Sequence, residues 1–208
     1  MNPEEVDIHM WRDEIRQLRE KSKSYSEKEN LIAFYGSSTI RLWENMDEDL
    51  KPHQVINLGF GGSSYWWCDY HFEEVFEFLQ PKKMVLYAGD NDLENNTPKD
   101  KILGFISSLV DKIGRKYGGI PIIIIGVKPS PVRVQLREKI ENLNSSLLSI
   151  TKQLNHGSYI NIYREMLNFD GTVRPELFME DQLHLNLKGY ALWKKVIKDH
   201  LDKQANLW

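Results

Sequence analysis

Five short apolar runs are spaced along the chain, and they are bounded by glycine, asparagine or proline. Runs of this length and composition are typical of β-strands that are buried on both faces of a sheet. The expected strands are Leu31–Tyr35, Val55–Phe60, Met84–Ala88, Ile120–Val127 and Tyr159–Tyr163.

Longer segments between these runs carry apolar residues at every third or fourth position, which places those residues along one face of a helix. The expected helices after the first strand are Ser64–Leu79, Pro98–Tyr117, Val132–Leu154 and Leu187–Leu201. A further helix, over about residues 4–22, is predicted before the first strand. Its apolar positions are Val6, Met10, Trp11, Ile15 and Leu18.

Strand and helix alternate along the chain, which predicts a parallel sheet with helices on both faces. We therefore expect an α/β fold: a three-layer α/β/α sandwich around a five-stranded parallel sheet, flavodoxin-like in outline. The chain has 208 residues, 41% of them hydrophobic, which is enough for one well-filled core. No repeat or linker interrupts the pattern, so residues 1–208 are predicted to form a single domain.

Residues with catalytic potential follow three of the expected strands at the point where each strand ends. Ser38 follows the first strand, Gly61 and Gly62 follow the second, and Asn91 follows the third. Because the carboxyl ends of parallel strands meet at one edge of the sheet, we expect these residues to lie close together.

A candidate general base lies far along the chain, in the loop before the last expected helix. Asp181 and His184 are three residues apart there, and a serine nucleophile needs both a base and a carboxylate that orients the base. The alternative is that Ser37 and Ser38 cap a helix, and that Asp181 is a cap beside a satisfied surface histidine, His184. Of the six histidines, only His184 has a carboxylate placed in this way, which favours the catalytic interpretation.

Two further clusters allow more than one interpretation. Gly61 and Gly62 are compatible with a simple turn, and they match a dinucleotide-binding fingerprint poorly, but an amide exposed there is a good oxyanion donor. The acidic residues around Asn91 suggest a cation loop, yet Asp90, Asp92 and Glu94 lack the ligand alternation and turn glycine of a calcium site. We therefore expect no metal, and we assign the Asn91 amide to the same oxyanion.

Charge and cysteine content narrow the functional class. The net charge is −3 and the estimated pI is 6.1, with basic residues scattered among acids, so nucleic acid and anionic membranes are not expected partners. The apolar run Ile120–Gly126 is too short to span a bilayer. Met1–Val6 has no features of a secretory signal, so we expect a cytoplasmic protein. The single Cys68 excludes an internal disulfide and a multi-thiolate metal site, and its surroundings favour a core position.

Four blocks of the sequence together resemble the SGNH (GDSL-like) hydrolase superfamily, and they occur in the order that is typical of that family. The blocks are Gly36-Ser37-Ser38, the glycine block with Gly62, Gly89-Asp90-Asn91-Asp92 and Asp181-Gln182-Leu183-His184. The resemblance extends from about Leu31 to Trp193. Within the superfamily, the chain is similar to the platelet-activating-factor acetylhydrolase catalytic subunits and related bacterial acylhydrolases.

The resemblance implies a role for each block. Ser38 is then the nucleophile, His184 the base, and Asp181 the residue that orients His184. The oxyanion hole is implied to consist of the backbone amides of Ser38 and Gly62 and the side chain of Asn91.

The serine block departs from the usual Gly-Asp-Ser, because Ser37 stands where the family has an acidic residue. That acidic residue is not a member of the triad, so the departure does not exclude activity. It leaves open whether Ser37 reshapes the pocket or its hydrogen bonds.

The expected function is that of a serine esterase or acylhydrolase that cleaves short-chain esters, with acetyl preferred, through an acyl-enzyme on Ser38 and without a cofactor. The expected partner is a small-molecule ester, and no pattern indicates an oligomeric state. Two alternatives stay open: a carbohydrate- or lipid-binding module on the same scaffold, and an acyltransferase. No substrate-binding residue is assigned, because Tyr65, Trp66 and Trp67 fit an aromatic binding surface and a helix core equally well.

Overall fold

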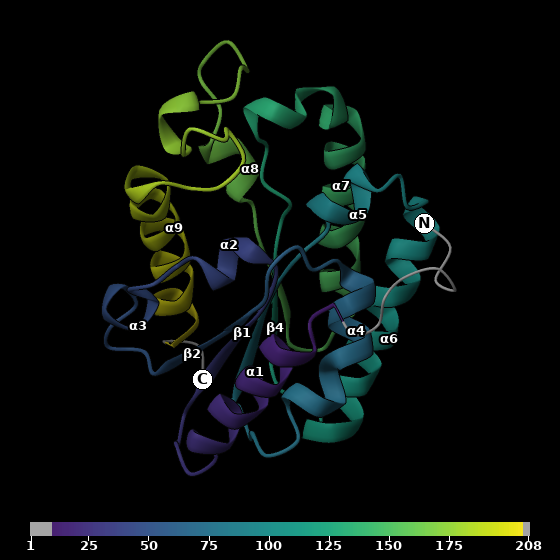
Figure 1. The fold of residues 1–208 in the computed structure, drawn as a ribbon, viewed down its shortest axis with the longest axis vertical. Helices are drawn as coiled ribbons and strands as arrows, with labels where there is room; N and C mark the ends of the chain where they lie inside the picture. Colours follow the sequence, from purple (N-terminus) through teal and green to yellow (C-terminus); the bar gives the residue numbers. More distant parts are fainter. Residues whose placement is uncertain (1–9, 206–208) are drawn as a thin grey trace.

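In a computed structural model, which describes residues 10–205, five strands form one parallel sheet (Figure 1). The strands are β1 (Ile32–Gly36), β2 (Val55–Gly59), β3 (Lys83–Tyr87), β4 (Ile122–Ile125) and β5 (Gly157–Ile160). Their order across the sheet is β2-β1-β3-β4-β5, and every neighbouring pair is parallel. The predicted five-stranded parallel sheet is thus confirmed.

Helices cover both faces of the sheet, as predicted (Figure 1). One face is covered by α1 (Arg12–Ser24), α4 (Tyr65–Val75), α6 (Lys99–Tyr117) and α7 (Arg137–Gln153). The other face is covered by α2 (Ser38–Arg41), α3 (Met46–Asp49), α8 (Ile162–Glu165) and α9 (Leu187–Ala205). Three short helical segments complete the part of the chain that the structure describes: α5 (Asp90–Glu94), η2 (Pro131–Leu136) and η3 (Pro175–Leu177).

The alternation of side chains along each strand divides the core into these two layers. In β1, Ala33 and Tyr35 pack into the cluster under α1, α4, α6 and α7, whereas Ile32 and Phe34 pack into the cluster under α9. All five residues of β1 are buried, as expected for a central parallel strand. Within residues 10–205, no helix is both long enough and apolar enough to cross a bilayer.

Some predicted boundaries were wrong. The fifth strand ends at Ile160, because the side chain of Asn161 caps α8 by accepting a hydrogen bond from the amide of Arg164, at 3.5 Å. Ile162 and Tyr163 are therefore buried residues of a helix and not of a strand. The segment predicted as one helix from Val132 begins with the 3-10 turn η2, and α7 starts only at Arg137.

The N-terminal helix was predicted over about residues 4–22. Within the described residues it runs from Arg12 to Ser24, so it continues two residues beyond the predicted end. Val6 and the other residues before position 10 lie outside the described part of the chain.

The sheet register aligns the ends of its first three strands. Gly36 of β1 lies opposite Gly59 of β2 and Tyr87 of β3, so the segments that follow these strands leave the sheet at the same edge. Gly36 has a φ of +152°, and a Cβ at this position would lie 1.8 Å from the carbonyl oxygen of Tyr87. The chain can therefore turn out of β1 toward Ser38 only because this residue has no side chain.

Candidate active site

Ser38 is the first residue of α2 and sits two residues beyond the end of β1. The turn is held by Ser37, whose amide donates to the carbonyl of Tyr87 on β3, at 2.9 Å. Ser38 Oγ lies 3.1 Å from His184 Nε2, although 146 residues separate the two in sequence. The structure therefore brings together the serine and the histidine that the sequence motifs singled out.

Asp181 and His184 share a tight loop that precedes α9. His184 Nδ1 lies 2.6 Å from Asp181 Oδ2, and Asp181 Oδ1 accepts hydrogen bonds from the amides of Leu183 and His184, at 2.9 and 3.0 Å. Burial alone would raise the pKa of Asp181, but the hydrogen bonds from the His184 side chain and from these two amides lower it to about 2. Asp181 is therefore an anion across the neutral range and a fixed acceptor for the imidazole.

The position of this carboxylate decides which histidine nitrogen is free. An ionised carboxylate can only accept hydrogen bonds, so a neutral His184 carries its proton on Nδ1. Its Nε2 then has a lone pair directed at the hydroxyl of Ser38. This arrangement allows the imidazole to take the serine proton, which is the function of the base in a serine hydrolase.

Asn91 lies in the first turn of α5, beyond the end of β3. Its side-chain nitrogen donates to the carbonyl of Ser63, at 3.0 Å, and thereby ties α5 to the glycine loop after β2. An amide nitrogen carries two hydrogens, so this bond leaves the second one for a ligand. Gly62, with a φ of +65°, directly precedes Ser63, so the structure places the loop of the expected donor Gly62 beside Asn91.

Arg133 is a site residue that the sequence motifs did not indicate. It comes from η2, after β4, and its two terminal nitrogens donate to Asn91 Oδ1 at 3.3 and 3.2 Å. Because a guanidinium can only donate, it fixes the Asn91 oxygen on its own side and the amide nitrogen on the other. Arg133 therefore determines which way the Asn91 amide points.

The acidic residues around Asn91 have partners other than a metal. Asp90 lies 3.6 Å from Lys128 Nζ and 3.5 Å from Arg133, and Glu94 lies 3.3 Å from Arg133. Burial raises the pKa of Asp92 to about 7. The hydrogen bonds that its side chain accepts from the amide of Tyr65 oppose this rise. These acidic residues connect α5 to Lys128, to Arg133 of η2 and to the start of α4.

The aromatic residues after the glycine loop form part of the core. Tyr65 and Trp67 are buried, and Trp66 packs on Trp67 with a centroid distance of 4.0 Å. Cys68 is buried as well, and burial raises the pKa of its thiol far above the usual range. The core interpretation therefore holds for Tyr65, Trp67 and Cys68.

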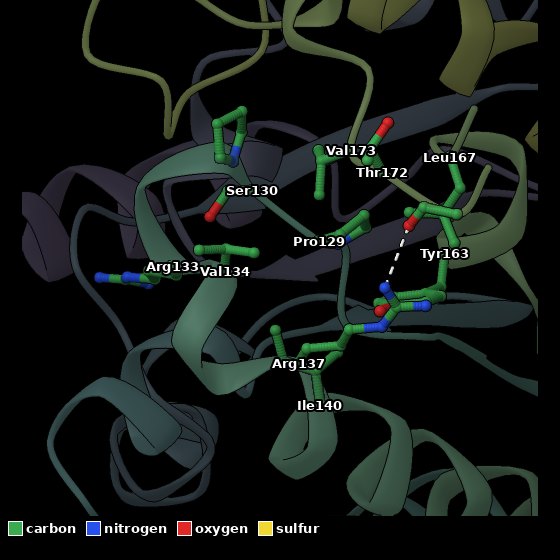
Figure 2. A pocket seen from close by; sticks show the side chains of 12 residues that line it. Pro129, Ser130, Arg133, Val134, Arg137, Ile140, Tyr163, Leu167, Thr172 and Val173 are labelled. Carbon is green, nitrogen blue, oxygen red and sulfur yellow. Dashed lines mark hydrogen bonds between the residues drawn. The ribbon is translucent and has the colours of Figure 1, made fainter.

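A cavity of about 290 Å³ opens beyond the ends of β4 and β5, with walls from residues 129–140 and 163–173 (Figure 2). Its surface is mostly apolar, with Val134, Ile140 and Leu167 among the lining residues. Arg137 lines it too, but its guanidinium is bonded to the carbonyl of Gly171 and to Glu141. Ser38 and His184 do not line the cavity, so we do not assign the cavity to the part of a substrate that would react with Ser38.

The three-layer parallel fold and the hydrogen-bonded series from Ser38 through His184 to Asp181 are typical of serine hydrolases of the α/β class. The profile of the GDSL-like Lipase/Acylhydrolase family matches residues 24–192. The chain therefore belongs to this family of carboxylic ester hydrolases, as the sequence motifs predicted.

Solved structures of other proteins share this fold. A candidate acylhydrolase from Bacteroides fragilis is 24% identical, with a TM-score of 0.79 over 96% of this chain and 99% of that one. A candidate platelet activating factor protein from Streptococcus pneumonia is 19% identical, with a TM-score of 0.78 over 91% and 93%. An acetylxylan esterase from Geobacillus stearothermophilus is 13% identical, with a TM-score of 0.68 over 81% and 92%. A comparison with curated proteins gave no match.

Proposed function

We propose that the protein is a serine esterase that cleaves short-chain esters, acetyl esters foremost, through an acyl-enzyme on Ser38. The observation that carries this proposal is the pair of contacts that joins Ser38 Oγ to His184 Nε2 and His184 Nδ1 to Asp181. They provide a nucleophile, a base and an orienting carboxylate in one line, at the edge of the sheet where ligands bind in this class of fold.

The proposed reaction has two halves. His184 Nε2 takes the proton of Ser38 as Oγ attacks the ester carbonyl, and the tetrahedral intermediate then collapses. The ester C–O bond breaks, the leaving alkoxide receives the proton from His184, and the acyl group stays on Ser38. Water, activated by His184, then attacks the acyl-enzyme, so that a carboxylic acid leaves and Ser38 regains its proton.

The developing negative charge needs donors that are in place before the reaction. We assign this role to the amide of Ser38, the amide of Gly62 and the side chain of Asn91. Ser38 begins α2, so its amide is one of the N–H groups that have no partner within the helix. The contact between Asn91 and Arg133 supports the assignment, since it directs the amide nitrogen, and not the oxygen, away from the guanidinium.

Replacement of Asn91 tests the oxyanion assignment. We expect Asn91→Ala to lower kcat by roughly 10²–10³ with little change in KM, because this hydrogen bond strengthens only as charge develops. Steady-state kinetics with p-nitrophenyl acetate measure both constants. A rise in KM at unchanged kcat would instead make Asn91 a substrate-binding residue.

Preference for short acyl chains is supported by the compact chain and by the fold that it shares with an esterase of acetylxylan. We expect acetyl and butyryl p-nitrophenyl esters to be cleaved faster than octanoyl or longer esters. The test is a measurement of kcat/KM across the series. Product analysis of the same assay with an added acceptor alcohol shows whether the acyl group is transferred to the alcohol and not only to water. A maximum at long chains, or a jump in rate above the micellar concentration, would point to a lipase.

A further inference from the structure

Helix α1 lies almost entirely outside the part of the chain that the family profile matches, which begins at residue 24. Ile15 and Leu18 are buried in the core that α1 shares with α4, and the helix packs against α4 (Figure 1). This packing explains why α1 docks on the domain. It does not explain the polar contacts that the start of the helix makes.

These polar contacts converge on one residue of the glycine loop. Trp11 Nε1 donates a hydrogen bond to the carbonyl oxygen of Gly61. Both carboxylate oxygens of Glu14 lie 3.2 Å from the amide nitrogen of Gly61, which donates to them. The two polar backbone groups of Gly61 are thus both bonded to side chains from the first turn of α1 and the residue before it.

Fixing the carbonyl of Gly61 also fixes the amide of Gly62, because the two belong to the same peptide unit. That peptide is trans, so its C=O and N–H point in opposite directions and lie in one plane. With the Gly61 oxygen directed at Trp11, the N–H of Gly62 is directed away from α1. A hydrogen bond to the carbonyl also polarises the peptide and makes its N–H a stronger donor.

A glycine loop needs such an external constraint more than most segments do. Gly61 and Gly62 have no side chains that could hold their backbone, and Gly62 adopts a left-handed φ of +65°. An oxyanion donor is effective only if it is oriented before the charge develops. The preorganisation must therefore come from neighbouring residues.

We propose that Trp11, assisted by Glu14, is a positioning residue that aims the Gly62 amide into the oxyanion hole. The inference rests on the proposed function, because it assigns the Gly62 amide to the oxyanion. It gives the start of α1, which precedes the family-matched region, a role in positioning the oxyanion donor, and leaves the buried residues of the helix a purely structural role. It also gives Trp11 a role beyond its edge-on packing against Phe60 and Trp67.

The test separates the indole N–H from the packing of the ring. Trp11→Phe keeps an aromatic ring on Phe60 and Trp67 but removes the donor. We expect kcat and kcat/KM for p-nitrophenyl acetate to fall together by about tenfold with KM unchanged, a smaller loss than removal of a whole oxyanion donor. Glu14→Ala should lower kcat severalfold, and Glu14→Gln, which keeps an acceptor oxygen, should restore most of the activity.

Leu18→Ala is the matched control, since it removes a buried side chain from the same helix and leaves the contacts to Gly61 intact. We expect it to lower the melting temperature at least as much as Trp11→Phe while kcat stays within about twofold of the wild type. Ile15→Val takes its place if Leu18→Ala does not fold. An equal loss of kcat in the control would show that α1 acts through stability alone, and would overturn the proposal.

Amide spectra give a readout that does not depend on catalysis. Labelling with ¹⁵N-glycine reports only the 13 glycines of the chain. We expect Trp11→Phe to shift the resonances of Gly61 and Gly62 and to increase the mobility of Gly62, and Leu18→Ala to leave both unchanged. The proposal is wrong if these resonances do not respond, or if they respond while kcat is unchanged.

The same experiment distinguishes this inference from the proposed function. A wild-type protein that neither hydrolyses esters nor reacts with a fluorophosphonate contradicts the proposed function, and the oxyanion role of Gly62 falls with it. The glycine spectra would then still decide whether Trp11 orients the loop. An active wild type with an unaffected Trp11→Phe variant overturns only the inference about α1.

Discussion

Replacement of Ser38 by alanine is expected to lower kcat by at least roughly 10³ while the protein stays folded, as for nucleophiles of other serine hydrolases. The physical reason is that His184 Nε2 would face a methyl group in place of the hydroxyl that lies 3.1 Å away. The measurement is kcat with p-nitrophenyl acetate, together with a thermal unfolding curve that checks the fold.

A fluorophosphonate probe identifies the nucleophile independently of turnover. We expect a covalent adduct on Ser38, mapped by mass spectrometry, and none in Ser38→Ala. Ser37→Ala is the matched control, since Ser37 is adjacent and buried and its hydroxyl has no hydrogen-bond partner among residues 10–205. That variant should still be labelled on Ser38. An adduct on Ser37, Ser63 or Ser64 would contradict the assignment of the nucleophile.

The second large effect is expected at Asp181 and His184. Asp181→Asn should lower kcat by roughly 10³–10⁴, because the imidazole loses the acceptor that holds its proton on Nδ1 and the counter-charge that stabilises its protonated form. His184→Ala should be at least as harmful. Circular dichroism checks that both variants are folded.

The pH dependence follows from the same pair. The reaction requires the neutral form of His184, because a protonated imidazole cannot accept the serine proton. Asp181 stays ionised down to strongly acidic pH, since its hydrogen bonds lower its pKa to about 2, and it remains the acceptor for that imidazole. The contribution of Asp181 to stability is likewise present above about pH 4 and is lost only as the pH falls toward 2.

The outcomes of these two variants discriminate between mechanisms. An inactive His184→Ala together with a nearly unaffected Asp181→Asn would mean that another group orients the base. If both variants keep their activity, the Asp181–His184 loop has no role in the reaction and the motif is only a turn before α9.

The fold was largely predictable, because burial in a parallel sheet leaves a strong apolar signal. The same signal gave a wrong end for β5, since Ile162 and Tyr163 are apolar like strand residues. They belong to α8, which Asn161 caps, and their side chains are buried as part of that helix. An apolar residue in the sequence indicates burial, but it does not indicate whether the residue belongs to a strand or to a helix. The η2 turn was missed for the same reason: its apolar residues continue the helical spacing of α7.

The candidate site was predictable where it depends on local motifs and not where it depends on packing between distant segments. The motifs around Ser38 and His184 could be read in the sequence. Arg133 belongs to no such motif, and it reaches Asn91 only because η2 folds back beside α5. Trp11 was recognised as an apolar position on a helix, but periodicity reveals neither its N–H donor nor the carbonyl that this donor meets.

The separation of Ser38 and His184 along the chain also determines when the site can form during synthesis. The serine and its strand leave the ribosome before the base, which follows 146 residues later and is held by the loop before α9. That helix is tied to the nucleophile turn by Tyr190, whose hydroxyl donates to the carbonyl of Thr39 at 3.0 Å. A growing chain therefore carries the serine without its base, and the site is complete only after the last helix has emerged and docked.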